Sequence, residues 1–124
     1  YDKCRFIGWA AGEKKDEAFQ NCSIFCLPSK NEGMPMSVLE AMSYGLATIA
    51  TPVGGVPQII NDGVDGFLFP VDDVTALTEK LDVLMSDNAL KERIGKCGRA
   101  CIEKSFSLDA YMDQIDTIYE IIRK

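Results

Sequence analysis

The sequence predicts an α/β fold in which a parallel sheet is flanked by helices. Up to Pro70, short apolar runs with strand character alternate with longer runs of helical period, and this alternation is typical of parallel sheets with helical crossovers. After Pro70, apolar residues recur only at helical spacing. A chain of 124 residues is large enough for one hydrophobic core and short for two. We therefore expect residues 1–124 to form one domain.

Four segments are predicted to be strands, because each is short, apolar and bounded by Gly, Pro, Asn or Asp. They are residues 4–7, 23–27, 47–51 and 66–69. Helices are expected between them over about residues 15–21, 36–44 and 56–60. Gly45 is well placed to end the second of these helices, since glycine readily adopts the left-handed conformation that follows many helices.

Three apolar stripes at helical spacing follow Pro70. They are formed by Leu77, Leu81, Leu84 and Met85, by Leu90, Ile94, Cys97 and Cys101, and by Leu108, Tyr111, Met112, Ile115, Ile118, Tyr119 and Ile122. Core packing accounts for nearly all of them. The last stripe is the longest, and Ser107, Leu108 and Asp109 are residues typical of the start of a helix. So long an apolar face on the last helix suits contact with a neighbouring domain or self-association.

The composition argues against several classes of function. The net charge is −6 and Lys and Arg are not clustered, which disfavours nucleic-acid binding. The sequence has no histidine, so the commonest general base and zinc ligand is missing. No apolar run approaches the roughly 20 residues that cross a bilayer, and the sequence shows no secretory leader. We expect a cytoplasmic protein without a transmembrane segment.

The five cysteines, at positions 4, 22, 26, 97 and 101, indicate reduced thiols. Their odd number and the lack of a leader favour a reducing compartment. Cys97 and Cys101 fit one face of a helix, whereas Cys22 and Cys26 straddle a predicted helix end and strand. We therefore expect thiols that behave as small buried hydrophobic groups, and no metal site.

The most informative segment, residues 31–42, is predicted to be a ligand loop that runs into a helix. Gly33 lets the backbone approach a ligand, and Pro35 suits the first helical turn, where no N–H is needed. The unpaired N–H groups and positive dipole of such a helix start favour phosphate or sugar oxygens. Glu32 precedes the helix. Glu40 lies inside it among apolar residues, where its carboxylate suits a vicinal diol.

A second loop follows the next predicted strand. Thr51 ends that strand and the pair Gly54-Gly55 follows it, while Glu32 follows the strand that ends at Leu27. Ligands of parallel α/β sheets bind beyond the carboxyl ends of the strands, so both loops are expected to line one cleft. Taken singly, a glycine pair is most often a turn and two glutamates are usually solvated. The two loops together favour a ligand site.

The motifs of the chain occur in a distinctive order. They are Phe6-Ile7-Gly8, Pro28-Ser29, Glu32-Gly33, Glu40-Ala41-Met42, Gly45, Gly54-Gly55-Val56-Pro57, Asp65-Gly66, and Pro70 with Asp72 or Asp73. In this order they resemble the nucleotide-sugar-binding domain of GT-B glycosyltransferases, specifically the large retaining family 4 (glycosyl transferases group 1). The resemblance spans almost the whole chain. It implies a Rossmann-like parallel sheet flanked by helices, the C-terminal half of a GT-B enzyme.

The resemblance also implies roles for individual residues. Glu32 would be the catalytic residue, touching hydroxyls of the donor sugar and stabilising positive charge at its anomeric carbon. The donor sugar and phosphates would be held by a run of five residues, namely Gly33, Met34, Pro35, Met36 and Ser37. The backbone N–H groups of these residues would bind the sugar and phosphates, except at Pro35, which has no N–H group. Glu40 would accept hydrogen bonds from the ribose, and the loop around Gly8 would face the base.

The implied reaction is transfer of a sugar from a UDP- or GDP-sugar to an acceptor hydroxyl with retention of configuration. Neither a cofactor nor a metal ion is implied. The usual setting of the family is polysaccharide or glycolipid assembly, in the cytoplasm or peripherally at the inner membrane face.

The sequence departs from the family pattern at several points. Gln58 stands where many relatives have glutamate, and the basic pair that neutralises the diphosphate belongs upstream of Tyr1. We expect a partial domain that lacks the N-terminal acceptor-binding domain and does not turn over in isolation.

Other interpretations stay open at this point. A nucleotide-sugar-binding module without catalysis fits the missing partner residues. A nucleotide-sugar epimerase of related fold is disfavoured by the spacing of Glu32 and Glu40. A phosphoacceptor signalling domain would need aspartates clustered at strand ends, whereas the four candidates are predicted in turns outside the cleft: Asp62, Asp65, Asp72 and Asp73.

Overall fold

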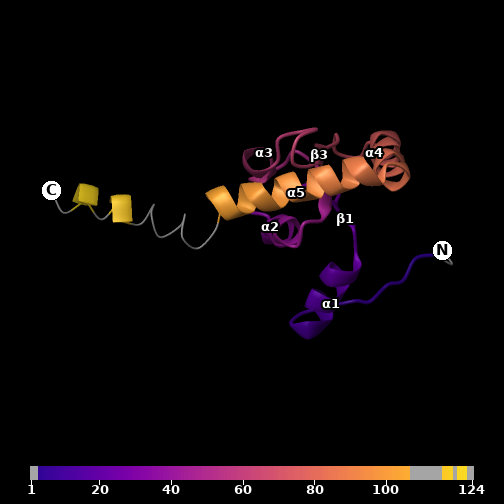
Figure 1. The fold of residues 1–124 in the computed structure, drawn as a ribbon, viewed down its shortest axis with the longest axis horizontal. Coiled ribbons are helices and arrows are strands. Elements are labelled where there is room, and N and C mark those ends of the chain that lie inside the picture. Colours follow the sequence, from indigo (N-terminus) through magenta and orange to yellow (C-terminus); the bar gives the residue numbers. More distant parts are fainter. Residues whose placement is uncertain (1–2, 107–115, 119, 123–124) are drawn as a thin grey trace.

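A computed structural model describes residues 3–106, 116–118 and 120–122 of the chain. The main elements are, in order, α1 (Glu13–Asn21), β1 (Ile24–Leu27), α2 (Met36–Ser43), β2 (Ala47–Ala50), α3 (Val56–Ile59), β3 (Phe67–Leu68), α4 (Val74–Ser86) and α5 (Asn88–Ser105). Strands and helices alternate up to β3, and the described residues after it form only helices and turns (Figure 1). This is the alternation that the sequence predicts.

The three strands form one parallel sheet in the order β1-β2-β3. In the register, Cys26 of β1 lies opposite Ile49 of β2, and Ile49 lies opposite Phe67 of β3. The central strand β2 is buried along its whole length. A strand buried on both faces is expected to be continuously apolar, and the sequence of β2, ATIA, agrees apart from Thr48, whose hydroxyl donates to the carbonyl of Leu46.

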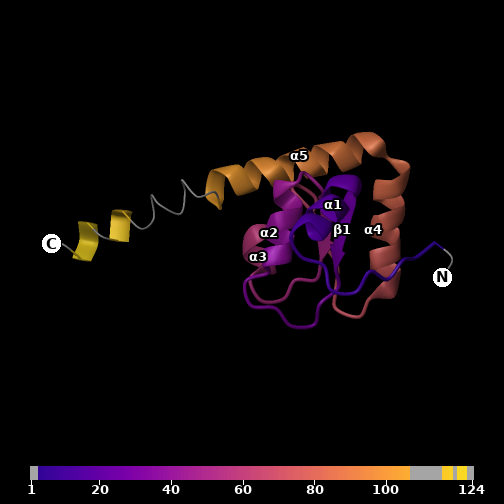
Figure 2. The ribbon, with the colours of Figure 1, turned by 90° about the horizontal axis from the view of Figure 1, so that it is seen from below.

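Helices pack on both faces of the sheet. On one face, Val38 and Met42 of α2 and Ile59 of α3 pack with Ala50 of β2 and with Ile102 near the end of α5. On the other face, a second cluster joins the sheet to α4 and the first half of α5, and its buried members are Ala47, Ile49, Phe67, Phe69, Leu84 and Ile94. The single helix α5 thus serves both clusters, and Figure 2 shows it running along the body of the molecule beside α2 and α4.

Two buried glycines let α5 pack closely against the rest of the chain. A side chain at Gly95 would collide with the carbonyl of Gly45, and one at Gly98 would press against Met42 and Asp65. Gly45 itself has φ +75 and follows α2. The predicted role of Gly45 in ending this helix is therefore confirmed.

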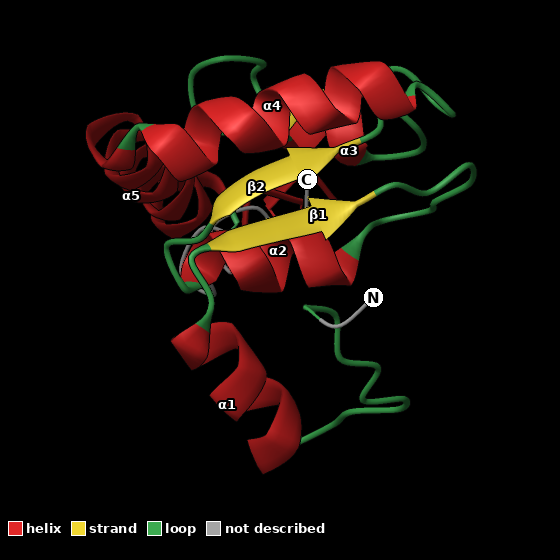
Figure 3. Cartoon of the chain, turned by 90° about the vertical axis from the view of Figure 1, so that its right-hand side faces the viewer, coloured by secondary structure: helices red, strands yellow, loops and turns green. Residues whose placement is uncertain are grey.

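The first helix, α1, stands apart from the other helices (Figure 3) and has no buried residue. It contacts α2 through the stacked rings of Phe19 and Tyr44, whose centroids are 5.3 Å apart, and through Tyr44 Oη, which donates to Asp16 Oδ1 at 2.8 Å. Phe19 also packs at 5.7 Å from the ring of Phe25 on β1. A few aromatic and polar contacts therefore dock α1 onto α2 and β1.

The predicted strand over residues 4–7 is wrong. Residues 4–11 run as an exposed loop in which Phe6 and Trp9 are 88% and 91% exposed. A strand needs a neighbour for its backbone groups, and here the carbonyl of Ile7 accepts instead from Lys14 Nζ at 3.0 Å. Apolar composition alone therefore misled the prediction for this segment.

The other predicted elements are confirmed within a few residues. The last predicted stripe lies mostly outside the described residues. Of its members, Ile118 and Ile122 are described, in short helical stretches, and both are exposed. Self-association through this face stays a prediction.

Candidate functional site

The loop between β1 and α2 delivers Pro35 to the N-cap of α2. Pro35 is buried, and its carbonyl accepts from the N–H groups of Val38 and Leu39 at 3.1 and 3.3 Å. The N–H groups of Met36 and Ser37 have no hydrogen-bond partner within the part of the chain that the structure describes. Two free donors and the positive end of the helix dipole thus point out from the start of α2, an arrangement that favours an anion.

Glu32 lies in the same loop and is held there by its neighbours. Its Oε1 accepts from Ser29 Oγ at 2.7 Å. The carbonyl of Ser29 in turn accepts from the hydroxyl of Thr51, which is buried at the end of β2. The Glu32 carboxylate is partly exposed, so its second oxygen is free to meet a ligand while the first is tethered to the ends of two adjacent strands.

The glycine pair after β2 fixes the position of this loop. Gly54 has φ +56, and a side chain on it would overlap the backbone carbonyl of Glu32. The N–H of Gly55 donates to the carbonyl of Gly33 at 2.8 Å. At both glycines the backbone of one loop comes close to the backbone of the other. The two loops beyond adjacent strands are therefore in contact.

Glu40 lies on the second turn of α2 and is engaged by the neighbouring helix. Its Oε2 is 2.9 Å from Lys15 Nζ of α1, and the two side chains are 35% and 38% exposed. The hydrogen bond and the negative charge of Glu40 raise the pKa of Lys15, so the ammonium keeps its charge. A carboxylate among apolar residues needs a polar partner, and in the folded protein Lys15 is that partner for Glu40.

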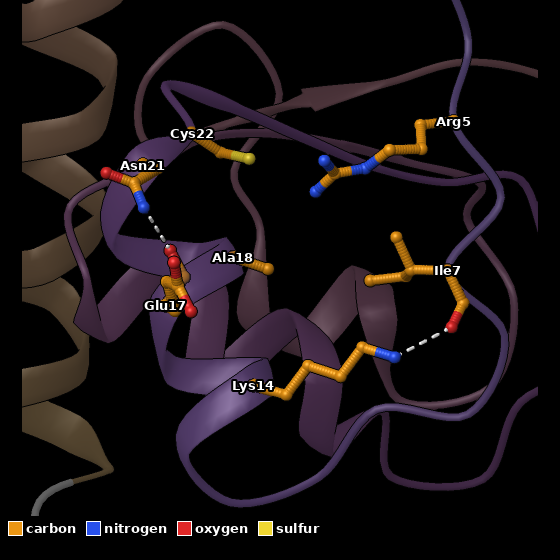
Figure 4. A pocket seen from close by; sticks show the side chains of 7 residues that line it. All are labelled: Arg5, Ile7, Lys14, Glu17, Ala18, Asn21 and Cys22. Atoms are coloured by element: carbon orange, nitrogen blue, oxygen red, sulfur yellow. Dashed lines mark hydrogen bonds between the residues drawn. The ribbon is translucent and has the colours of Figure 1, made fainter.

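The loop around Gly8 lies beside α1. Gly8 has φ +66, and the preceding carbonyl of Ile7 is held by Lys14. Between this loop and α1 lies a pocket of about 410 Å³. Figure 4 shows its lining, which consists of Arg5, Ile7, Lys14, Glu17, Ala18, Asn21 and Cys22. A second, mainly apolar hollow of about 240 Å³ adjoins it, with Ile7, Lys15 and Phe25 among its lining residues.

The structure brings most of the predicted site residues together along one segment. Glu32, Gly33 and Met34 lie in the loop, Pro35 caps α2, and Met36 and Ser37 begin the helix. Glu40 follows on the second turn. Gly8 belongs to a separate loop, which α1 connects to Glu40 by way of Lys14 and Lys15.

Sequence reasoning missed two residues of this arrangement. Ser29 could have been found, because a serine that precedes a glutamate by three positions often hydrogen-bonds locally. Lys15 gave no such signal, since its partner lies on a different helix. Lys30 lies in the same loop as Glu32, but its side chain is 70% exposed and its Nζ is 3.5 Å from Asp72 Oδ2.

The described part of the chain has neither a cluster of metal-binding side chains nor a membrane-spanning helix. Among the described residues, no group of three or more Cys, Asp or Glu side chains is arranged to hold a metal ion. Within the same residues, no helix combines the length and apolar character needed to cross a membrane.

Comparison with known proteins decides the family. Residues 1–100 match the family described as glycosyl transferases group 1. The chain belongs to this family. It is 39% identical over 102 residues to sulfoquinovosyl transferase SQD2 of Arabidopsis thaliana, a match that covers 80% of this chain and 20% of that protein. The chain spans 20% to 30% of the length of the first curated relatives that it matches.

Solved structures of glycosyltransferases share the fold. The C-terminal domain of the group 1 family protein LpcC from Francisella tularensis has a TM-score of 0.76 and 31% identity, covering 83% of this chain and 53% of that chain. Anabaena HepE in complex with UDP-glucose has a TM-score of 0.83 and 21% identity, covering 94% of this chain and 32% of that chain. The expected fold class, the Rossmann-like C-terminal half of a GT-B glycosyltransferase, is therefore confirmed.

Proposed function

We propose that this group 1 glycosyltransferase chain binds a nucleoside diphosphate sugar at the start of α2 and takes part in a retaining transfer to an acceptor hydroxyl. The observation that carries the proposal is the pair of unpartnered N–H groups at Met36 and Ser37, with Glu32 just before them and Glu40 just after. Amide donors and a positive dipole match a diphosphate, and carboxylates match sugar hydroxyls.

In this proposal Glu32 is the catalytic residue. Its second oxygen accepts hydrogen bonds from the donor sugar, while Ser29 holds the first. As the bond between the anomeric carbon and the phosphate oxygen breaks, positive charge develops on the sugar, and a carboxylate nearby stabilises it. The backbone amides of Gly33 and Met34 complete the sugar contact.

The leaving diphosphate gains negative charge in the same step. In this proposal the amides of Met36 and Ser37, the Ser37 hydroxyl and the α2 dipole stabilise that charge. Pro35 donates no hydrogen bond, but as N-cap it starts the helix that presents these groups. The acceptor oxygen then bonds to the anomeric carbon on the face that the diphosphate leaves, and the hydroxyl proton of the acceptor passes to the departing diphosphate oxygen.

Glu40 is assigned to the ribose hydroxyls, and the loop around Gly8 to the base. The donor is a UDP- or GDP-sugar, and the fold shared with a UDP-glucose complex supports this class. We further propose that the chain is the donor-binding part of a longer enzyme, whose N-terminal domain binds the acceptor. The chain spans only 20% to 30% of the length of the first curated relatives that it matches, which supports a longer enzyme. We place the enzyme in polysaccharide or glycolipid assembly, in the cytoplasm or at the inner membrane face.

Calorimetric titration with UDP, GDP and their common sugar conjugates tests the proposal. Glu40→Ala is expected to weaken every nucleotide, by about 1–3 kcal/mol, because it removes charge-assisted hydrogen bonds to the ribose. Glu32→Ala is expected to weaken the sugar conjugates by a similar amount while sparing the free diphosphates. Exposed Glu92 on α5 supplies a charge-matched control, and Glu92→Ala should leave every affinity unchanged.

The titration can support or contradict the proposed site. Binding of one nucleotide class together with the two different losses supports the donor site and identifies the base. If the protein binds a nucleotide and neither Glu32→Ala nor Glu40→Ala changes its affinity, the assignment of the site to α2 is wrong.

A further inference from the structure

Two consecutive lysines on the first turn of α1 reach two different parts of the site. Lys14 Nζ donates to the carbonyl of Ile7 at 3.0 Å, next to Gly8. Lys15 Nζ lies 2.9 Å from Oε2 of Glu40. The helix that carries them has no buried residue of its own, so packing in the core does not explain why α1 lies where it does. Its polar contacts connect the Gly8 loop to α2.

The contact with Lys15 uses only part of the Glu40 carboxylate. An ionised carboxylate has two oxygens and about four acceptor positions, and Lys15 occupies one of them, on Oε2. Among the described residues, no other side chain or backbone group donates to this carboxylate. The Oε1 atom therefore stays available for a diol while Oε2 is anchored.

An anchored glutamate differs from a free one in its conformational freedom. A long side chain loses rotamer entropy when it adopts a single geometry for a ligand, and part of that loss has already occurred where an ion pair fixes one oxygen. Glu40 is 35% exposed, so without Lys15 several rotamers would be open to it. Lys15 is charged at neutral pH, and the hydrogen bond to Glu40 raises its pKa further.

We propose that Lys15 is a positioning residue for nucleotide binding, which anchors Glu40 Oε2 so that Oε1 faces the ribose hydroxyls. This inference rests on the proposed function, because it requires Glu40 to bind the ribose. Lys15 acts through Glu40 and does not contact the sugar. It remains paired with Glu40 when the nucleotide is bound.

A double-mutant cycle tests the proposal. Calorimetric titration of the protein with UDP and GDP compares the wild type, Lys15→Met, Glu40→Ala and the double variant. Lys15→Met is expected to weaken the preferred nucleotide about fivefold, the effect of losing a partly exposed ion pair. In the Glu40→Ala background the same substitution should have no effect, because the residue through which it acts is gone. Lys15→Arg, which keeps the charge and a donor, should restore most of the affinity.

Two controls separate positioning from other effects. Tyr44→Phe removes the hydrogen bond from Tyr44 to Asp16 but keeps the ring that stacks on Phe19, and it leaves the pair of Lys15 and Glu40 in place. Lys96→Met removes the same charge from an exposed position on α5. Both variants should bind the nucleotide as the wild type does.

The results distinguish failure of the proposed function from failure of the role assigned to Lys15. Failure of the wild type to bind a nucleotide, or of Glu40→Ala to weaken binding, overturns the proposed function and with it this inference. If Glu40→Ala weakens binding but Lys15→Met strengthens it, Lys15 competes with the ribose and the inference alone is wrong. Equal losses from Lys15→Met in both backgrounds would also overturn it, since Lys15 would then act directly on the nucleotide.

Discussion

The backbone of Gly54 lies directly against the carbonyl of Glu32 and leaves no room for a side chain between them. This contact joins the loop after β2 to the loop that carries the proposed catalytic carboxylate. It also explains why a glycine with φ +56 stands at this position, because any other residue would meet both a strained backbone and an occupied space.

Substitution of Gly54 by alanine is therefore expected to be costly. We expect Gly54→Ala to lower the free energy of unfolding by about 3 kcal/mol or more, combining left-handed strain with overpacking. Gly63→Ala is the matched control, because Gly63 has φ +81 and faces open space, and it should lose only about 1–2 kcal/mol. Denaturant unfolding of both variants measures the difference. Equal losses would show that the contact between the loops does not constrain Gly54.

The thiols are expected to differ in reactivity. Burial raises the pKa of Cys26 on β1, whereas Cys22 is exposed at the end of α1. Since the thiolate is the reactive form, iodoacetamide at pH 8 should alkylate Cys26 several-fold more slowly than Cys22, as followed by mass spectrometry of the digested protein. In denaturant the two rates should converge. A faster reaction of Cys26 in the folded protein would contradict the packing of β1.

The docking of α1 on α2 should weaken at alkaline pH. The hydrogen bond to Asp16 raises the pKa of Tyr44, and the contact with Glu40 raises the pKa of Lys15. Both groups are protonated in their contacts, so their contributions are complete below the ordinary pKa values of 10.0 and 10.5. They are lost as the pH rises through the higher values of the folded protein.

Unfolding curves between pH 8 and pH 12 measure this loss. The double variant Tyr44→Phe with Lys15→Met should show a weaker decline in stability above about pH 10 than the wild type. Lys96→Met is the control for charge and should decline as the wild type does. If the double variant and the wild type decline in parallel, the two contacts do not stabilise the folded state.

The sequence predicts the sheet and helix α2 well because their signals are local. Strand β2 is apolar apart from Thr48, and the segment from Glu32 to Glu40 carries its own loop, proline and helix signals. The prediction for residues 4–7 was wrong because a strand depends on a neighbour that composition does not reveal. The contact of Lys15 with Glu40, and that of Gly54 with Glu32, were also beyond prediction, since each joins segments that meet only after folding.

The last prediction concerns the tether of the proposed catalytic residue. Ser29 Oγ donates to Glu32 Oε1 at 2.7 Å, so Ser29→Ala leaves the carboxylate in place but free to rotate. We expect this variant to bind sugar conjugates more weakly, by about 1–2 kcal/mol, and to bind free UDP or GDP as the wild type does. Ser86→Ala on α4, which removes a serine hydroxyl bonded to its own helix, should change neither affinity. If Ser29→Ala weakened both ligand classes equally, Ser29 would be holding the loop as a whole rather than orienting Glu32 toward the sugar.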